Sequence, residues 1–463
     1  MRADLLTAPV EGLDDALAAV DAFDGALVAG LLRPQSVEAG GVTRLAEAVA
    51  GSPLAEITAE ASAKASAGAA GEDHFVALAA ARTALLGAAH DALLLRVEEA
   101  ARRSREEPSA PGVAPEAPAN LLTAARAWLC DLARCGWQGL DHEVVSGAAE
   151  VVSAMLPEPS LRRLASLLDG FAAELAATCP GSSAERFPVR RWADLWTRGM
   201  LLTVPGAAAT PVAGTADGRL LPLGIDLQEH PTAAQAQVHA VFEPADGSTP
   251  RLVRATVSAP KPDTVLGAGV WQLLRPHMSL LAAFGEGRSM ELTGMPVTAE
   301  GDLIWSDDHA RPGEPAEPFV TARVALPAAT APVTAPADRH PARIAVPVFL
   351  EGYTARADED DAVAFTVAGV DLDVDTDRIP AAGPLTPKAV AGSGACIALV
   401  RWDAGKFTLQ PLAVETTVRK KVTAVHAGAW AGGTTDKAGA RAEKAATDAV
   451  KVLSERAGRL LRK

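Results

Sequence analysis

The chain has 463 residues, enough for two or three domains that each bury a core. With 49% hydrophobic and 22% charged residues, its composition is typical of a soluble globular protein. The net charge of −14 argues against a protein that binds nucleic acid over its whole surface, because phosphate contacts need clustered Lys and Arg.

Three further features predict a cytoplasmic protein. The first residues are acidic and lack the basic region and unbroken apolar stretch of a signal peptide. We expect no membrane span, because no stretch approaches the roughly 20 apolar residues that one needs. The four cysteines are too few to form a disulfide framework in a chain of this length.

The first part of the chain is rich in alanine and predicts helices. The segment Asp73–Arg103 is the clearest, since its apolar residues recur at three- and four-residue steps. Shorter helices are expected at Leu13–Leu32 and Val42–Ala50. Four prolines then end this helical subdomain of residues 1–107 and mark a linker over residues 108–119.

A second helical segment, residues 120–204, is expected to pack with the first. Its predicted helices are Leu121–Cys135, Glu143–Leu156, Leu161–Thr178 and Trp192–Leu202. Consecutive helices with short connections indicate a bundle or a solenoid of helix pairs. We favour the bundle, because the sequence shows no fixed repeat.

Near Thr203 the apolar period changes to that of strands, which predicts a β-rich α+β domain over residues 205–427. The expected strands are Gly218–Asp226, Gln235–Phe242, Arg251–Ser258, Ser289–Thr298, Asp302–Trp305, Ile344–Leu350, Ala362–Val374, Ala395–Trp402 and Phe407–Val414. A helix is expected at Val270–Phe284. Pro347 restricts the strand Ile344–Leu350 to a sheet edge, because proline has no N–H for a ladder.

Residues 312–341 are rich in proline and predict an extended linker or a long arm laid over the domain surface, with Phe319–Leu326 as the strand candidate. Residues 428–463 are expected to form a Gly-rich joint and a basic amphipathic helix from about Thr435. The predicted fold class is therefore multidomain α+β. A helical N-terminal bundle precedes a β-rich α+β domain and a C-terminal amphipathic helix.

Two acidic groups in the β-rich domain are candidates for chemistry. The segment Asp371–Asp377 has aspartate at every second position, so a strand would place four carboxylates on one face. That face indicates either a calcium or magnesium site or a solvated edge strand whose charges oppose aggregation. Asp307, Asp308 and His309 form a polar loop, where functional residues concentrate.

The familiar catalytic and metal-binding signatures are missing from the sequence. Cys130 and Cys135 lack the second ligand pair of a zinc site, so we interpret the cysteines as small buried hydrophobic residues. The nine histidines are scattered, and no H-E-x-x-H, G-x-S-x-G or Walker A motif occurs. We therefore expect neither a metal nor a cofactor, and catalytic residues stay unassigned.

The densest group of aromatic and cationic residues lies at the change of period. Trp192 and Trp196 share a helix face, and Arg190, Arg191 and Arg198 flank them. Such a group can stack nucleic-acid bases or anchor a protein partner. Alternatively, both indoles pack at the junction between the domains while the arginines meet acidic neighbours.

The tail Asp436–Lys463 has eight basic and four acidic residues, a net charge of +4 in an acidic protein. Leu453 and Leu460 belong to its apolar stripe, and Lys451 and Arg456 are among its cations. These four residues are candidates for docking into a partner groove, on an acidic surface or, more weakly, on a membrane. The alternative is a helix that packs back on the acidic N-terminal domain.

Two segments, Arg190–Thr203 and Cys396–Val414, resemble parts of uncharacterised actinobacterial proteins. Proteins of this kind accompany SWIM zinc-finger, MoxR-type ATPase and von Willebrand A-type proteins. The likeness covers a small part of the chain and includes no catalytic residue. The Cys/His pattern of a SWIM protein and nucleotide-binding loops are both missing here. The resemblance implies an accessory subunit that works beside such partners.

The sequence thus predicts a non-enzymatic cytoplasmic accessory or interaction protein, a subunit of a multi-protein assembly with protein partners. One alternative is an enzyme whose unrecognised site in the β-rich domain uses Asp307–His309 or Asp371–Asp377. The other is nucleic-acid binding through the Arg190–Arg198 cluster, although the charge makes nucleic acid an unexpected main partner. Oligomeric state and any small-molecule ligand stay unassigned.

Overall fold

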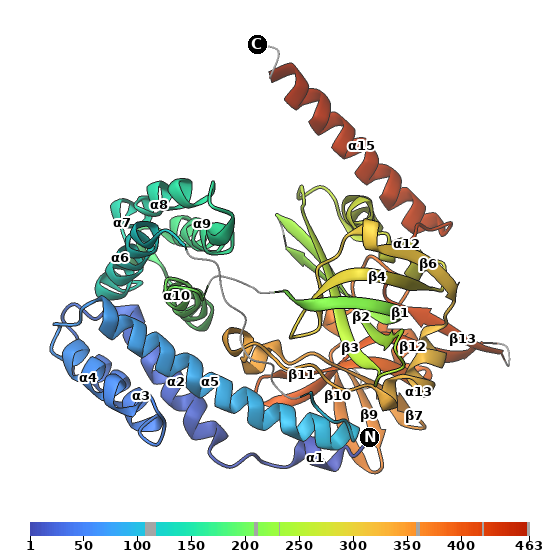
Figure 1. Ribbon diagram of the computed structural model, residues 1–463, viewed down its shortest axis with the longest axis horizontal. Helices are drawn as coiled ribbons and strands as arrows, with labels where there is room; N and C mark the ends of the chain where they lie inside the picture. Colours follow the sequence, from blue (N-terminus) through green and yellow to red (C-terminus); the bar gives the residue numbers. More distant parts are fainter. Residues whose placement is uncertain (107–116, 208–211, 231, 358–361, 419–420, 461–463) are drawn as a thin grey trace.

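A computed structural model describes residues 1–106, 117–207, 212–230, 232–357, 362–418 and 421–460. Helices make up 48% and strands 26% of the structure, which confirms the predicted α+β class. The N-terminal helices form one body and the strands form another, and the last helix, α15 (Lys437–Leu460), projects from the second body (Figure 1).

Most of the N-terminal helices share one hydrophobic core. Their bounds are α1 (Asp4–Thr7), α2 (Leu13–Ala29), α3 (Ser36–Ala48), α4 (Ala55–Ser66), α5 (Glu72–Ala101), α6 (Ala119–Cys135), α7 (His142–Ser146), α8 (Ala148–Met155), α9 (Arg162–Thr178) and α10 (Val189–Leu202), with 3-10 turns η1 (Pro159–Leu161) and η2 (Gly181–Ser183). Phe23, before the proline-rich linker, and Phe171 and Trp196, after it, are buried in this core. The two helical segments therefore pack as one body. Residues 107–116, most of the predicted linker, lie outside the described part.

Gly30 and Gly136 allow the ends of α2 and α6 to touch. Both have positive φ, 90° and 70°, a backbone conformation that favours glycine. A Cβ on Gly136 would lie 2.3 Å from the backbone nitrogen of Gly30, which leaves no room for a side chain. Beside this contact, the Leu31 N–H donates to the Ala133 carbonyl at 2.9 Å.

Helix α5 belongs to two cores. Phe75 and Leu78 in its first half are buried among the N-terminal helices, whereas Leu93 and Val97 in its second half pack against the second sheet together with Leu6 of α1. The cores therefore do not divide at residue 107, because the start of the chain and half of α5 cover the strands. Helix α5 is also long and apolar enough to cross a membrane, and its most apolar part is mostly buried; no other helix in the described ranges passes this test.

The first sheet closes on itself. Its strands are β1 (Val212–His230), β2 (Ala233–Pro244), β3 (Arg251–Pro260), β4 (Arg288–Thr298), β5 (Asp302–Leu303) and β6 (Ala310–Pro315), in the order β1-β2-β3-β5-β4-β6. The long strand β1 pairs with β4 along its first half and with β2 along its second, which joins the two ends of the sheet. The enclosed core receives the short helices α11 (Val270–Leu274) and α12 (Leu280–Gly285).

The second sheet has seven strands and packs on α1 and the second half of α5. The strands are β7 (Val346–Glu351), β8 (Thr354–Ala357), β9 (Val363–Val367), β10 (Val370–Val374), β11 (Ser393–Asp403), β12 (Lys406–Val418) and β13 (Lys421–His426). Their order is β7-β11-β12-β10-β9-β8, and β13 pairs with β12. Within the described strands β7 pairs only with β11, so Pro347 lies at a sheet edge, as predicted.

The predicted strand Phe319–Leu326 is wrong, because this segment forms helix α13 (Pro318–Val324). Pro318 occupies the first turn, where a missing N–H costs nothing. Phe319, Ala322 and Leu326 are buried at three- and four-residue spacing between the two sheets, while Val320 and Val324 are exposed. The spacing of the buried residues, rather than β-branched composition, decides the element.

Two other predicted elements are interrupted. The helix expected at Val270–Phe284 is broken into α11, the 3-10 turn η4 (Arg275–His277) and α12, and Pro276 lies at the break. The strand expected at Ala362–Val374 consists of β9 and β10, joined by a tight turn in which Ala368 and Gly369 have φ of 50° and 87°.

The proline-rich segment 312–341 is an arm laid between the two bodies, one of the two predicted alternatives. The Ala331 N–H donates to the Ser104 carbonyl just beyond α5, and the Leu252 N–H of β3 donates to the Thr330 carbonyl, both at 2.9 Å. The arm continues through the 3-10 turns η7 (Pro336–Asp338) and η8 (Pro341–Arg343), which contact α5. It therefore holds the helical body against the first sheet.

Candidate functional site

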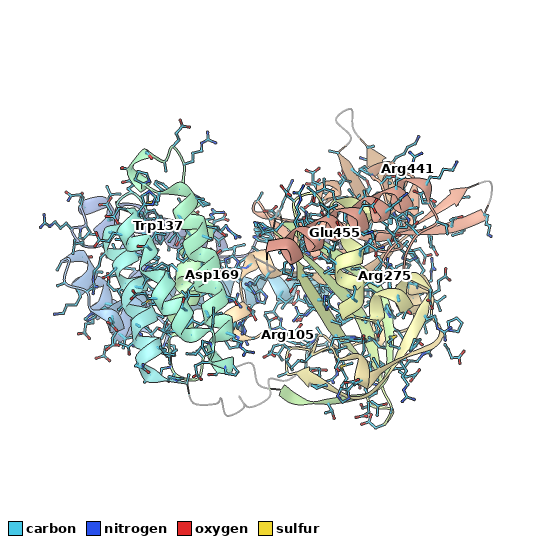
Figure 2. All side chains as sticks on the ribbon, turned by 90° about the horizontal axis from the view of Figure 1, so that it is seen from above. Arg105, Trp137, Asp169, Arg275, Arg441 and Glu455 are labelled. Atoms are coloured by element: carbon cyan, nitrogen blue, oxygen red, sulfur yellow. The ribbon has the colours of Figure 1, made fainter. Side chains whose placement is uncertain are left out.

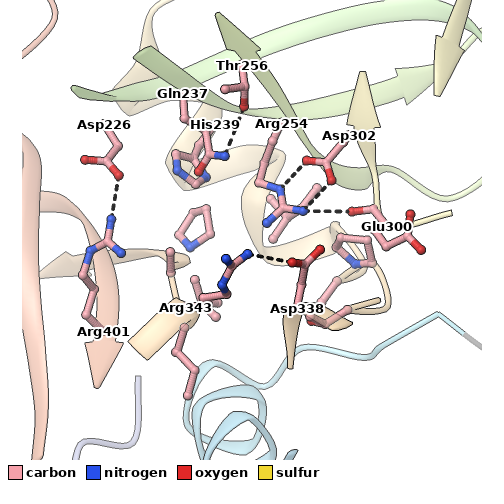
Figure 3. A pocket seen from close by; sticks show the side chains of 18 of the residues that line it. Asp226, Gln237, His239, Arg254, Thr256, Glu300, Asp302, Asp338, Arg343 and Arg401 are labelled. Carbon is pink, nitrogen blue, oxygen red and sulfur yellow. Dashed lines mark hydrogen bonds and ion pairs between the residues drawn. The ribbon is translucent and has the colours of Figure 1, made fainter. Parts of the chain in front are cut away.

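A cleft of about 860 Å³ lies where α5, the arm and both sheets meet (Figure 3). His90, Leu94 and Glu98 of α5 form one side, and residues of the arm from Ala331 to Arg343, with the segment that leads into β7, form another. The remaining lining comes from Arg191 of α10, from β1, β2, β3 and β5 of the first sheet with the turn before β5, and from Arg378 and Arg401 beside and within the second sheet. The cleft is therefore a product of the whole chain.

The cleft floor is the outer face of the first sheet. Gln235, Gln237 and His239 of β2 line the cleft, while Ala236 and Val238 between them point into the enclosed core. This alternation follows from the two-residue period of a strand. Polar residues at such positions normally face water, but here the arm and the second sheet cover them.

Register places the floor residues in rows across the strands. Gln237 pairs with Asp226 of β1 on one side and with Thr256 of β3 on the other. The Gln237 amide donates to the Thr256 hydroxyl at 3.2 Å. In the next row, His239 pairs with Arg254. Thr256 is exposed, Gln237 half-buried and His239 buried, so the floor deepens from Thr256 toward His239.

Asp226 is the centre of a buried hydrogen-bond network. Its carboxylate accepts from Arg401 of β11 at 2.6 Å, from Gln410 of β12 at 2.8 Å and from Gln228 at 3.0 Å. Burial alone would raise the pKa of Asp226, but the Arg401 guanidinium and the two amide donors hold it below its usual value. This network bonds the first sheet to the second.

His239 is buried, and its Nε2 atom has no hydrogen-bond partner among the described residues. Burial lowers the pKa of His239, Asp226 opposes this effect, and Arg254 and Arg401 add to it, so that the pKa is about 3. The imidazole is therefore neutral at physiological pH. A buried nitrogen without a partner is rare in folded proteins and marks a place where a further group fits.

The other guanidinium groups in the cleft are also paired. Arg254 contacts Asp302 through Nε and Nη2, each at 2.9 Å, and Arg343 contacts Asp338 at 2.6 Å. Figure 3 shows Arg254, Arg343 and Arg401 approaching the cleft from three sides. Positive and negative groups therefore balance along the lining. The cleft offers amides, a neutral imidazole and spare guanidinium N–H groups, which suit a polar ligand with both donors and acceptors.

The aspartates of the segment Asp371–Asp377 do not form one carboxylate face. Strand β10 ends at Val374, so only Asp371 and Asp373 are exposed on the same face. Asp371 contacts Arg356 at 3.6 Å, and Asp373 contacts Lys406. β10 lies between β12 and β9, so the edge-strand interpretation is also wrong. Among the described residues, no group of three or more His, Cys, Asp or Glu side chains is placed to hold a metal ion.

The loop at Asp307 lies apart from the cleft. Asp307 accepts hydrogen bonds from the Ser279 hydroxyl and the Trp305 indole, and these bonds fix the loop beside the first sheet. His309 contacts the Thr293 carbonyl at 2.9 Å. The cleft lining contains neither this loop nor an aspartate of the segment Asp371–Asp377. The residues named for the enzyme alternative therefore do not converge.

Trp192 and Trp196 lie inside the helical core and not between the bodies. Both are almost completely buried, and the Trp196 indole donates to the Leu129 carbonyl at 2.8 Å. The flanking arginines meet acidic neighbours, with Arg190 on Asp21, Arg191 on Glu174 and Arg198 on Asp338. The indoles are thus out of reach of a base or a partner. Arg198 and Asp194 connect this helix to the arm, through Asp338 and His340.

The tail helix divides into a docked and a projecting half. Ala446 is buried on the first sheet, and the side chains of Lys451 and Arg456 are exposed. The side chains of Leu453 and Leu460 lie outside the described part. Figure 2 shows α15 crossing over the strand body, with Arg441 near the start of the helix and Glu455 near its end. The tail therefore docks in cis on the 3-10 turn η3 (Gly267–Gly269) and helix α11 of the strand body rather than on the helical body.

The sequence did not point to His239, Asp226 or Arg401. The alternating segment from Gln235 to Ala240 correctly predicts a strand, but the same pattern describes any strand with one wet face. Only the covering arm and second sheet turn these residues into a buried polar site. No family model, curated protein or solved structure matches this chain. Its function is therefore argued from the geometry above.

Proposed function

We propose that the protein is a non-enzymatic, cytoplasmic interaction protein that serves as an accessory subunit of a multi-protein assembly. The observation that supports this proposal is the division of α15 into an anchored base and a projecting end (Figure 1). A helix end that leaves the body exposes a surface that folding of the chain itself does not use.

The base of α15 is held firmly. A Cβ on Gly269 would lie 2.6 Å from the Ala446 Cβ, so the glycine permits close approach of the helix. Arg275 contacts Glu443 at 3.1 Å and donates through Nε to the Ala431 carbonyl at 2.7 Å. The helix therefore projects at a defined angle, which lowers the entropy cost of binding a partner.

The two halves of the tail also differ in charge. Residues 436–450 contain three basic and three acidic residues, whereas residues 451–463 contain five basic residues and one acidic residue. The +4 charge of the tail thus lies entirely in the projecting end. The described side chains of Lys451, Glu455 and Arg456 make no ion pair with the rest of the described protein.

We infer that the partner is a protein with an acidic groove and an apolar floor. Ala442, Ala446 and Val450 are the positions that pack on the core of the first sheet, beside the turn at Gly269 and helix α11, and the sequence continues their spacing with Leu453 and Leu460. The helix would offer this stripe between basic residues, which is the helix-in-groove mode of recognition. The resemblance to actinobacterial proteins names candidates, namely SWIM zinc-finger, MoxR-type ATPase or von Willebrand A-type proteins.

The test removes the projecting end and keeps its anchor. Full-length protein and a variant that ends at Val450 are used as baits in an extract of the source organism, and captured proteins are quantified by mass spectrometry. We expect the truncation and the variant Lys451→Glu/Arg456→Glu to lose the same protein. That protein should bind a synthetic peptide of residues 437–463, with affinity that falls as salt rises.

The matched control is Arg33→Glu/Lys64→Glu, an equal charge change at exposed positions of the helical body. It should retain the captured protein. Equal capture by full-length and truncated baits would remove the docking role of the tail. Loss of a self-associated species, or of binding to anionic vesicles, would instead assign the tail to a second copy or a membrane.

A further inference from the structure

We propose that the interdomain cleft binds a small polar molecule that carries a carboxylate group. The proposal is independent of the tail, because no residue of α15 lines the cleft. It starts from His239, a lining residue of the cleft whose buried Nε2 atom has no hydrogen-bond partner among the described residues. Leaving such an atom unpaired costs free energy, and a ligand acceptor removes that cost.

His239 has guanidinium groups as neighbours. Arg254 lies beside it on β3, and Arg401 approaches from the second sheet. Arg254 lies 2.9 Å from Asp302 through both Nε and Nη2, of which Nη2 donates a hydrogen bond. Arg401 donates through Nε and Nη2 to Gln410 and Asp226. The Nη1 group of each arginine donates to no described residue. The imidazole of His239 and the guanidinium groups of Arg254 and Arg401 therefore bring N–H donors to the same cleft, and such donors suit a planar carboxylate.

The charge balance of the lining favours a singly charged anionic group over a doubly charged one. Each cleft guanidinium already holds a carboxylate of the protein, so the lining as a whole is close to neutral. A single carboxylate adds one negative charge beside spare donors. A doubly charged phosphate would add a larger repulsion from Asp226, Asp302 and Asp338, which are fixed around the same space.

The uncharged residues of the lining indicate which kind of molecule carries the carboxylate. Gln235 and Gln237 present amides on the floor, and Thr256 presents a hydroxyl toward the exposed end. No aromatic ring other than histidine is among the lining residues, so stacking of a sugar ring or a nucleobase has no platform there. The volume of about 860 Å³ accommodates a molecule from an amino acid up to a short peptide.

The experiment screens the full chain by ligand-observed NMR and thermal shift. The panel contains the proteinogenic amino acids, small mono- and dicarboxylic acids, inorganic phosphate and glucose. We expect at least one amino acid or carboxylic acid to bind and raise Tm, and phosphate and glucose to have no effect. In long-range ¹H–¹⁵N spectra, the bound ligand should shift the His239 ring signals, assigned with His239→Gln.

Two variants test the site in different ways. His239→Gln replaces the rigid imidazole donor by a flexible amide, and Gln235→Ala shortens a half-buried floor residue whose side chain makes no hydrogen bond to another described residue. Each variant should bind the carboxylate ligand at least tenfold more weakly than the wild type. The Tm of each ligand-free variant shows whether its fold is intact. His142→Gln, at an exposed position on α7, and the chain that ends at Val450 should bind as the wild type does.

Three results would overturn the proposal. The first is that no carboxylate in the panel binds. The second is that both variants bind a carboxylate with wild-type affinity. The third is that phosphate binds as tightly as the carboxylates, which would show a general anion site. None of these results bears on the partner of the tail, so the two proposals fail separately.

Discussion

Asp226 and Asp373 are both aspartates that contact a cation, but their surroundings differ. The Asp226 side chain is 3% exposed and Arg401 is 9% exposed, whereas Asp373 and Lys406 are each more than half exposed. A buried pair cannot lose one partner without leaving the other charge unpaired in a medium of low polarity. An exposed pair is replaced by water at little cost.

We therefore expect Asp226→Asn to lower the free energy of unfolding by about 3–5 kcal/mol, because Arg401 stays buried without its counter-charge. Asp373→Asn should cost less than about 1 kcal/mol. Denaturant titrations of the two variants and the wild type provide the comparison. Equal losses in both variants would contradict the buried network that joins the two sheets.

His239 predicts a pH dependence whose sign follows from its burial. An unfolded histidine binds a proton below about pH 6.5, but the folded protein holds the pKa of His239 at about 3. Between these values the unfolded state binds more protons, so stability falls as pH falls. From this site alone we expect a loss of about 2 kcal/mol between pH 7.5 and pH 5.

The measurement is a set of denaturant unfolding curves between pH 7.5 and pH 5. His239→Gln should make the dependence shallower, because it removes one group that titrates only in the unfolded state. His426, whose pKa burial lowers to about 4, keeps its own contribution. His142→Gln changes an exposed histidine and should leave the slope as in the wild type. An unchanged slope in His239→Gln would show that His239 is not held neutral in the folded protein.

At the scale of elements, α5 carries the largest structural consequence. Its sequence predicted one long amphipathic helix, but the residues do not say which partner covers each turn. The first half meets helices and the second half meets a sheet. A single helix thus connects the two bodies. A substitution in its second half should therefore lower the stability of the strands that it covers.

We expect Leu93→Ala to lower the free energy of unfolding by about 2–5 kcal/mol, because Leu93 is fully buried against the second sheet. Leu95→Ala, two residues further on the same helix, should cost far less because Leu95 is 54% exposed. Hydrogen exchange should show faster exchange in β11 and β12 for Leu93→Ala alone. Protection unchanged in those strands would contradict the assignment of this half of α5 to the sheet core.

The tail and the arm show how far elements follow from local pattern. The tail helix was predicted from its stripe and basic residues, because an amphipathic pattern is local. The segment Phe319–Leu326 was predicted as a strand, because valine and phenylalanine favour strands when packing is unknown. Burial between two sheets selected the helix instead. Where a segment is enclosed on both sides, its packing outweighs the intrinsic secondary-structure propensity of its residues.

At the scale of the whole molecule, ion pairs on the arm hold the helical body in place. Arg343 of the arm and Arg198 of α10 contact the Asp338 carboxylate at 2.6 and 2.5 Å. Burial would raise the pKa of Asp338, but these arginines hold it below its usual value. Arg339 contacts Asp91 of α5 at 3.1 Å, next to this cluster.

We expect Asp338→Asn to lower the free energy of unfolding by about 1–3 kcal/mol, because the clustered arginines lose their shared acceptor. Asp21→Asn removes an exposed partner of Arg190 within the helical body and should have a smaller effect. Denaturant midpoints measure both changes. In Asp338→Asn, limited proteolysis should also cut the arm sooner. Equal midpoints and equal cleavage in the two variants would contradict the role of the arm as a clasp.

The sequence by itself determined the class and order of the elements, because helix and strand periods and the punctuation by proline and glycine are local properties. It predicted the helical part, most strands, the edge position of Pro347 and the amphipathic tail. It did not determine where the cores divide, that Trp192 and Trp196 are enclosed, or that Asp226, His239 and Arg401 meet. Those facts depend on contacts between residues far apart in the chain. Only the tertiary structure decides which polar faces are covered, and covering a polar face is what makes a site.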